Sequence, residues 1–203
     1  MKTKLVVALL FLPVALLGQN SPATVFHSDG AFAQFQTVSA GTEIILQVTR
    51  GTDSSGNPAT FLVYDTLTPT ADGFADTFAN GTIPDSAFTG GDPAHLSLNV
   101  DTSQLTSFSS TSCNFSLNDF SFVCGPGPVG AIQIDWQQDR TFTTHTVANV
   151  QQTFSQFMEQ QHTISDSGSA IATGSFLGST IDPPATGQAG VNHNSLLQIF
   201  KLQ

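Results

Sequence analysis

Apolar and polar residues alternate with a period of two at several places in this chain, which constrains its fold more than any other feature. The clearest runs are 43–49, 95–101 and 131–137. Because successive side chains of a strand point to opposite faces, such runs predict strands of an antiparallel sheet with one buried and one wet face. We expect the buried set to be Ile44, Leu46, Val48, Leu96, Leu98, Val100, Ile132, Ile134 and Trp136.

The composition agrees with a β fold. The chain has 17 phenylalanines among its 203 residues, and aromatic residues favour strands. The helix-favouring residue glutamate occurs at Glu43 and Glu159 alone. A hydrophobic content of 39% argues for a core rather than for disorder. The sequence therefore predicts an all-β fold, an antiparallel β-sandwich that is jelly-roll-like or immunoglobulin-like.

Residues that favour turns separate the predicted strands. Breaks are expected at 51–58, 90–93 and 124–128, where glycine and proline cluster. A hairpin tip is expected at Ser28–Gly30, between two short apolar pairs. Residues 69–93 contain isolated phenylalanines among aspartate and glycine, which predicts a long excursion with one or two short strands.

The segment 147–160 is ambiguous. Val147, Val150, Phe154, Phe157 and Met158 fit one face of an amphipathic helix. The same residues also fit a long strand, and the flanking segments are β-like. We favour the strand, with one short helix near 147–160 as the alternative.

The N-terminus has the layout of a secretory signal peptide. Lys2 and Lys4 precede an apolar run of thirteen residues from Leu5 to Leu17, and Gly18 follows. The run is short for a membrane span. We expect residues 1–18 to be a signal peptide cleaved after Gly18, with Ala23 as the second choice. The remaining residues 19–203 are then a single exported domain, extracellular or periplasmic, with no membrane span.

The charge excludes two classes of partner. The formal net charge is -10, and removal of Lys2 and Lys4 leaves 3 basic against 15 acidic residues, a net charge of -12. Affinity for nucleic acid depends on lysine and arginine that neutralise phosphates. Anionic membrane surfaces likewise attract basic segments. We therefore expect neither nucleic-acid binding nor peripheral binding to such membranes.

The two cysteines, Cys113 and Cys124, predict a structural disulfide. In an exported chain an isolated pair of cysteines is expected to be oxidised. A hairpin that turns at Asn118–Asp119 brings the two sulfurs opposite each other. The ten intervening residues make a small loop, for which the chain-entropy model gives about 2–3 kcal/mol of stabilisation.

The segment Ser165-Asp166-Ser167-Gly168-Ser169 is similar to the Gly-Asp-Ser-Gly-Gly segment of trypsin-like proteases. In that family the middle serine is the nucleophile and backbone amides form the oxyanion hole. Here serines replace the first and last glycines, and no matching histidine segment lies upstream. We interpret the segment as a turn between strands.

Metal ligands are not gathered in the sequence. The five histidines, His27, His95, His145, His162 and His193, show no close pair of the kind that zinc sites use. Asp72, Asp76, Asp85 and Asp92 lie within 21 residues, and calcium binds such carboxylates together with carbonyl oxygens. No Asp-x-Asp-x-Asp-Gly loop is present, so calcium is a minor alternative and no cofactor is expected.

A polar ligand site is predicted on the wet face of the strand at 131–137. Trp136 shares its face with Ile132 and Ile134 and is expected in the core. The opposite face carries the candidate ligand-binding residues Gln133, Asp135 and Gln137 and leads to Arg140. The chain has one tryptophan and one tyrosine, too few to build the stacking platforms on which sugars commonly bind.

These observations favour an exported, non-catalytic interaction or surface module whose partner is a protein or a glycan. No catalytic residues stand out, so an enzyme is the less favoured interpretation. The alternatives are a secreted hydrolase that acts on glycans and a calcium-dependent glycan-binding protein. The hydrolase needs paired carboxyl groups, and Asp101 with Asp135 could supply them if their strands were neighbours.

Overall fold

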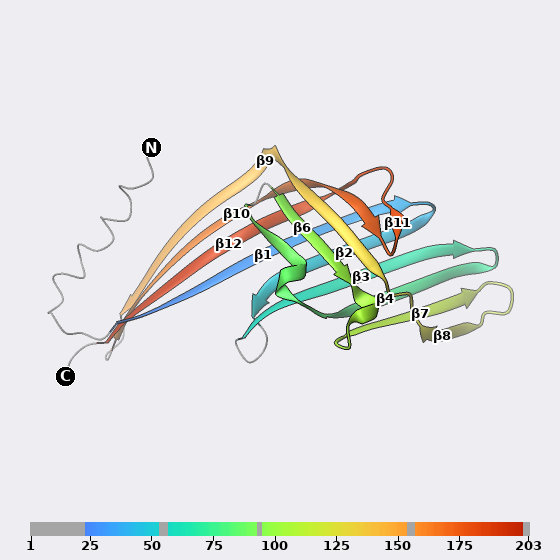
Figure 1. Ribbon diagram of the computed structural model, residues 1–203, viewed down its shortest axis with the longest axis horizontal. Helices are drawn as coiled ribbons and strands as arrows, with labels where there is room; N and C mark the ends of the chain where they lie inside the picture. Colours follow the sequence, from blue (N-terminus) through green and yellow to red (C-terminus); the bar gives the residue numbers. More distant parts are fainter. Residues whose placement is uncertain (1–22, 53–56, 93–94, 154–156, 201–203) are drawn as a thin grey trace. The chain divides into compact units, whose positions relative to one another are not determined.

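A computed structural model of the chain describes residues 23–52, 57–92, 95–153 and 157–200. Almost all of this described chain is β-strand, and it contains no α-helix. The strands pair into one antiparallel sheet, and in the larger of the two compact units described below this sheet curls into a half-barrel rather than clearly a two-sheet sandwich (Figure 1). The expected all-β antiparallel fold is confirmed at this level. The predicted signal peptide, residues 1–18, lies outside the described residues.

The strands are numbered in chain order, as in Figure 1, and the described residues also contain two short 3-10 helices, η2 and η3. The strands pair in the order β5-β6-β9-β10-β12-β1-β2-β3-β4-β7-β8, and β11 pairs with β10. The elements are β1 (Ala23–Ser39), β2 (Thr42–Thr52), β3 (Pro58–Thr70), β4 (Gly73–Ile83), η2 (Asp85–Ala87), β5 (Phe88–Asp92), β6 (His95–Asp101), η3 (Thr102–Gln104), β7 (Phe108–Ser116), β8 (Phe122–Pro126), β9 (Ala131–Thr153), β10 (Phe157–Phe176), β11 (Ser179–Thr180) and β12 (Ala185–Phe200).

The chain divides into two compact units. Of the described residues, the smaller unit comprises 23–27, 147–153, 157–163 and 194–200, and the larger comprises the rest, within 28–146 and 164–193. In the described part of the smaller unit, polar side chains pair between strands. Gln198 donates a hydrogen bond to Glu159 at 2.6 Å, and Gln160 donates one to Gln151 at 3.4 Å.

The inner face of the sheet in the larger unit carries the hydrophobic core. All nine residues that the alternation assigns to the core are buried there, each at most 8% exposed. Trp136 and Tyr64 are the largest fully buried side chains. Burial raises the pKa of the Tyr64 phenol, whose hydroxyl donates a hydrogen bond of 2.5 Å to the carbonyl oxygen of Pro128.

The distribution of side-chain size explains why one sheet can enclose this core. The strands in the middle of the sheet carry six buried alanines beside larger residues such as Phe35 and Phe176, whereas the buried residues of β2, β6 and β9 are mostly larger. The small residues are Ala170 and Ala172 on β10, Ala185 and Ala189 on β12, and Ala31 and Ala33 on β1. A side chain at Gly187 of β12 would collide with the carbonyl oxygen of Gln34 on β1, so these strands approach closely. Small residues and glycines of this kind allow a sheet to bend.

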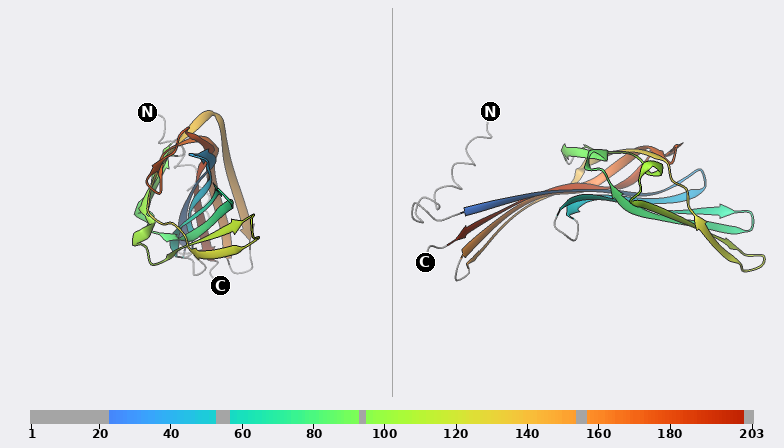
Figure 2. Two further views of the ribbon diagram at one scale, coloured as in Figure 1. Left: turned by 90° about the vertical axis from the view of Figure 1, so that its right-hand side faces the viewer. Right: turned by 60° about the horizontal axis from the view of Figure 1, so that its bottom comes forward.

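The bend brings distant strands of the larger unit face to face (Figure 2). The rings of Phe35 on β1 and Trp136 on β9 lie 6.2 Å apart, and those of Tyr64 on β3 and Phe176 on β10 lie 5.1 Å apart edge to face. Aromatic contacts at these separations are favourable. The sheet therefore packs against itself, which supplies the buried layer that two stacked sheets would otherwise provide.

The observed strand boundaries test three predictions made for individual segments. Ser28–Gly30, expected to be a hairpin tip, lies inside β1, so that prediction is wrong. A side chain at Gly30 would overlap Asn192 of β12, which indicates a close approach of strands rather than a turn. Residues 69–93, expected to hold only short strands, include the eleven-residue strand β4. In the segment 147–160 the described residues are strand, as favoured, and the alternative helix is absent from them.

The predicted disulfide is present. Cys113 on β7 and Cys124 on β8 are bonded, and their Cα atoms lie 4.0 Å apart. The two cysteines face each other in the register of a hairpin that turns at Asn118–Asp119, as the spacing predicts. A disulfide-bonded pair is consistent with an oxidising, non-cytoplasmic compartment.

Within the described ranges, no helix has both the length and the apolar character needed to cross a membrane.

Candidate functional site

The predicted polar face on β9 is exposed to solvent. Gln133, Asp135 and Gln137 are all exposed and lie beside Asn99, Ser97 and His95 of β6, respectively. The Nε2 atom of His95 lies 3.7 Å from an oxygen of Asp135, with both side chains more than half exposed. The side chain of Arg140 lies outside the described residues. The structure therefore brings three of the four predicted residues onto one face.

A groove of about 410 Å³ lies elsewhere on the outer face, across β10, β12, β1 and β2. Amide and hydroxyl side chains dominate its lining, and no charged residue belongs to it. We call this feature the amide groove. Its lining residues are Gln34, Phe35, Gln36, Ile45, Leu46, Gln47, Ser169, Thr186, Gly187 and Gln188.

The glutamines of the amide groove are joined by hydrogen bonds. The side chain of Gln34 donates to Gln188 across β1 and β12 at 3.3 Å. Gln36 donates to Glu43, just outside the groove, at 2.6 Å. A primary amide has two donors and one acceptor oxygen, so each glutamine keeps capacity for a ligand beyond these bonds.

A second depression, of about 210 Å³, adjoins the amide groove because Ser169 and Gln188 line both. Phe32, Thr144, Ser167 and Gly168 complete its lining. This depression gives the neutral surface one partly exposed aromatic ring at its end, that of Phe32. The polar surface thus extends from β2 to β9 within the larger unit.

Carboxylates gather at the other end of the amide groove. Glu43, Asp65 and Asp76, from β2, β3 and β4, line a depression of about 210 Å³ together with Ile45 and Leu67. Partial burial, the charge of Asp76 and a hydrogen bond with Asp76 raise the pKa of the Asp65 carboxyl, and the charge of Glu43 adds to the shift. Side chains in hydrogen-bond contact are closer than the roughly 5 Å that separates the paired carboxyls of glycosidases. The pair therefore does not have glycosidase spacing.

The pair suggested for a hydrolase is not assembled. Asp101 on β6 lies opposite Ala131, whereas Asp135 lies opposite Ser97. The two aspartates are therefore four residue positions apart along the strands, about 13 Å at the usual rise per residue. Asp101 is instead the N-cap of η3, and its carboxylate accepts hydrogen bonds from the amide and the hydroxyl of Ser103.

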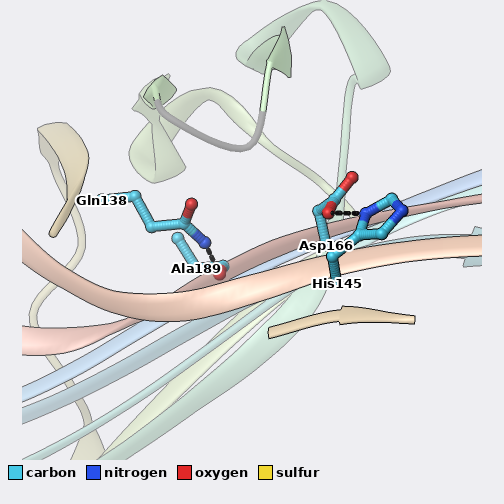
Figure 3. Close-up of polar contacts among 4 residues, drawn as sticks. All are labelled: Gln138, His145, Asp166 and Ala189. Atoms are coloured by element: carbon cyan, nitrogen blue, oxygen red, sulfur yellow. Dashed lines mark hydrogen bonds and ion pairs between the residues drawn. The ribbon is translucent and has the colours of Figure 1, made fainter. Parts of the chain in front are cut away.

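The segment that is similar to the protease motif is not a turn. Ser165–Ser169 lies within β10, and the carboxylate of Asp166 hydrogen-bonds the Nδ1 atom of His145 on β9 at 2.5 Å (Figure 3). In the same view the buried Gln138 donates to the carbonyl oxygen of Ala189 on β12 at 2.9 Å. Ser167 lines the second depression. The motif therefore lies within a strand, where its aspartate contacts His145 and its middle serine lines a depression.

A second histidine–aspartate pair lies on β12 and β1, where His193 contacts Asp29 at 2.8 Å. An aspartate on Nδ1 orients an imidazole and leaves Nε2 available for proton transfer or binding. The sequence does not indicate these pairs, because each joins residues from different strands. Among the described residues, no group of three or more histidine, cysteine or acidic side chains could hold a metal ion.

The aspartates considered for calcium are spread over the fold. Asp72 lies in the turn between β3 and β4, Asp76 faces Asp65, and Asp85 accepts a hydrogen bond of 2.6 Å from the hydroxyl of Thr60. The side chain of Asp92 is outside the described residues. The described structure does not assemble these residues into one site.

The amide groove was missed from sequence. Its residues come from four strands between residues 34 and 188, so their proximity depends on the strand order. A weak signal exists in the outward positions of β1, where Gln34 and Gln36 alternate with the buried Ala33 and Phe35. Comparison with protein-family models, with curated protein sequences and with solved structures finds no match for this chain.

Proposed function

We propose that this protein is an exported, non-catalytic binding module, with a sandwich-like buried layer, that holds a neutral glycan in the amide groove. The observation that carries the proposal is the groove itself. In a chain of net charge -10, its lining contains glutamine, serine and threonine side chains and no charged ones. Its volume of about 410 Å³ is within the usual range for small-molecule sites.

The chemistry of the lining favours hydroxyl-rich ligands. A sugar hydroxyl both donates and accepts hydrogen bonds, as a glutamine side chain does. Neutral groups avoid the desolvation cost of burying a charge under a ligand. Ile45 at one end and Phe32 beyond the other offer apolar contacts to sugar C–H groups. A glycan that lies across β10, β12, β1 and β2 would contact both kinds of group.

Two alternatives use the carboxylates beside the groove. A glycan-acting hydrolase is favoured by the raised pKa of Asp65, because a general acid must stay protonated near its working pH. Its close contact with Asp76 argues against glycosidase spacing. A calcium-dependent glycan-binding protein needs several oxygen ligands for the ion, and among the described residues no group of three or more acidic side chains could hold one. Both remain outcomes of the test below.

The test is binding of neutral oligosaccharides to the purified mature protein, followed by calorimetry and thermal shift with calcium or with EDTA. A ligand at a hundred times its dissociation constant adds about 2.7 kcal/mol of stability. We expect a double variant, Gln34→Leu with Gln188→Leu, to weaken binding at least about tenfold, since two polar contacts are lost. The matched control is Gln133→Leu with Gln137→Leu, which changes two exposed glutamines on β9.

The control also tests the site predicted from sequence. If only the double variant Gln133→Leu with Gln137→Leu lost binding, the ligand site would be the one predicted from sequence, Gln133, Asp135 and Gln137. Calcium dependence that Asp76→Asn removes would favour the calcium-dependent alternative. Release of sugar products that Asp65→Asn abolishes would favour the hydrolase. Absence of binding to every neutral glycan tested would overturn the proposal.

A further inference from the structure

The two edge strands of the described sheet, β5 and β8, differ in how they are protected. β5 pairs with β6 through an irregular register between Thr89 and Asp92, and Gly90 within it has a positive φ of 120°. Bulges and charged residues of this kind prevent an edge from pairing with another strand. β8 instead pairs with β7 in an unbroken register over its whole length, Phe122–Pro126.

The free edge of β8 has a defined set of backbone groups. Ser121 and Gly127, which flank β8, each exchange a backbone hydrogen bond with the β7 side, at 3.0 Å and 2.9 Å. Because hydrogen-bonded positions alternate in an antiparallel pair, Val123 and Gly125 also face β7. The amide and carbonyl groups of Phe122 and Cys124 therefore point away from β7, where no described strand pairs with them.

The side chains around this edge are apolar and exposed. Phe120, Phe122 and Val123 are 78%, 63% and 64% exposed, respectively. No charged residue occurs from 120 to 134, although the chain has a net charge of -10. A single-sign charge elsewhere on the molecule opposes contact between two copies, and the segment that would pair adds no charge of its own to this repulsion. Phe122 and Val123 are successive residues of one strand, so their side chains point to opposite faces and exposed apolar groups flank the free edge on both sides.

The hairpin that presents this edge is held in place. The disulfide joins Cys113 and Cys124, and the amide of Leu117 donates to the carbonyl oxygen of Asp72 at 2.6 Å. The amide of Ser121 donates to the side chain of Asp119 at 3.1 Å. A strand fixed before binding loses little conformational entropy when a partner adds to it.

We propose that β8 pairs with β8 of a second copy of this chain, antiparallel about a two-fold axis at Val123. In this register Phe122 of each copy faces Cys124 of the other, so the two amides and two carbonyls on each edge form four hydrogen bonds between the copies. The arrangement uses every outward amide between Phe122 and Cys124. It is self-complementary, as an isologous dimer interface must be. This inference is independent of the amide groove.

The first test is the oligomeric state of the Val123→Lys variant. The substitution places two lysines opposite each other at the two-fold axis and leaves the amide that bonds to β7 intact. Because like charges in contact oppose pairing, we expect the dimer dissociation constant to rise at least about tenfold. Val38→Lys is the matched control, since Val38 is 60% exposed and lies at the end of β1. Light scattering from about 1 µM to about 1 mM covers the range of weak dimers.

Amide hydrogen exchange provides a register-specific readout on the wild-type protein. We expect protection of the Phe122 and Cys124 amides to increase with protein concentration. The amides of Val123 and Gly125 should be protected at every concentration, because they bond to β7. A wild-type protein that stays monomeric throughout, or a dimer that Val123→Lys leaves unchanged, would overturn the proposal. Equal loss of dimer in the Val38→Lys control would overturn it as well.

Discussion

On β9, Ile134 and Trp136 are buried, whereas Asp135 and Gln137 between and beyond them are exposed, although all four belong to one strand. The inner set contacts side chains from strands that the bend brings opposite, so each of its members depends on the whole fold. The outer set contacts neighbours one strand away, and its members are joined by polar contacts exposed to water. Stability is therefore expected to depend on the inner face, whereas binding is expected to depend on the outer face.

The largest expected effect is that of Trp136→Ala. Removing a fully buried aromatic side chain costs about 3–5 kcal/mol of unfolding free energy, because the cavity is only partly refilled. For a domain of this size that lowers the Tm by roughly 6–20 °C. Gln137→Ala, one residue further along the outer face, should change stability by no more than about 0.5 kcal/mol. Equal losses in the two variants, measured by thermal unfolding, would contradict the distinction between the faces.

The second effect is that of the disulfide, which the register places on the outer face beside Asp76. Replacing both Cys113 and Cys124 by serine should lower the free energy of unfolding by about 2–3 kcal/mol, because the reduced chain gains conformational entropy when unfolded. Chemical denaturation of both forms measures this loss. Reducing agent should destabilise the wild type by a similar amount and leave the double variant unchanged. The outer face would then stabilise the fold through a covalent bond rather than through packing.

The smallest expected effect is at the carboxylates of the outer face, where a substitution should raise the free energy of unfolding rather than lower it. Because the pKa of Asp65 is raised in the folded state, ionisation of this group destabilises the fold. Its contribution to stability is present below the ordinary pKa of 3.8 and is lost as the pH rises through the raised value. Asp65→Asn should therefore stabilise the protein at pH 7 by about 0.5 kcal/mol, with the gain shrinking toward pH 4.

The matching variant for this test is Asp76→Asn, which removes the charge that, after burial, contributes most to the raised pKa of Asp65. Both single variants should give a similar gain at pH 7, and the double variant should give less than their sum, since both relieve one interaction. Thermal unfolding from pH 4 to pH 7 measures all three. If the gain in stability were the same at pH 4 and pH 7, the ionisation of Asp65 would not be its cause and the prediction would be wrong.

Much of the fold could be predicted from local patterns. The alternation at Ile44–Val48, Leu96–Val100 and Ile132–Trp136 identified buried positions correctly, because burial of one strand face follows from the period of the side chains. The spacing of Cys113 and Cys124 predicted their register, because a short hairpin leaves few pairings. Predictions failed where glycine was interpreted as a turn, as at Gly30, which lies inside β1 and permits a close approach to Asn192.

The amide groove could not be predicted in the same way. Gln133 and Gln137 were chosen because they alternate with core residues on one strand, and Gln34 and Gln188 do the same on β1 and β12. No local property separates these outward glutamines. They differ in the strands that lie beside them, and strand order is a long-range property. The same reason explains why Asp65 and Asp76 form a pair whereas Asp101 and Asp135 do not.

Local patterns in the sequence specify that this chain forms antiparallel strands, which side of the strands at 43–49, 95–101 and 131–137 is buried, and which cysteines pair. These properties depend on the period of two and on short separations along the chain. The tertiary structure alone decided that the small residues of β10, β12 and β1 lie together at the bend, and that polar residues from those strands and β2 share one groove. Which residues lie together in this way depends on the order in which the strands pair. Contacts between residues more than a hundred positions apart leave no local pattern in the sequence.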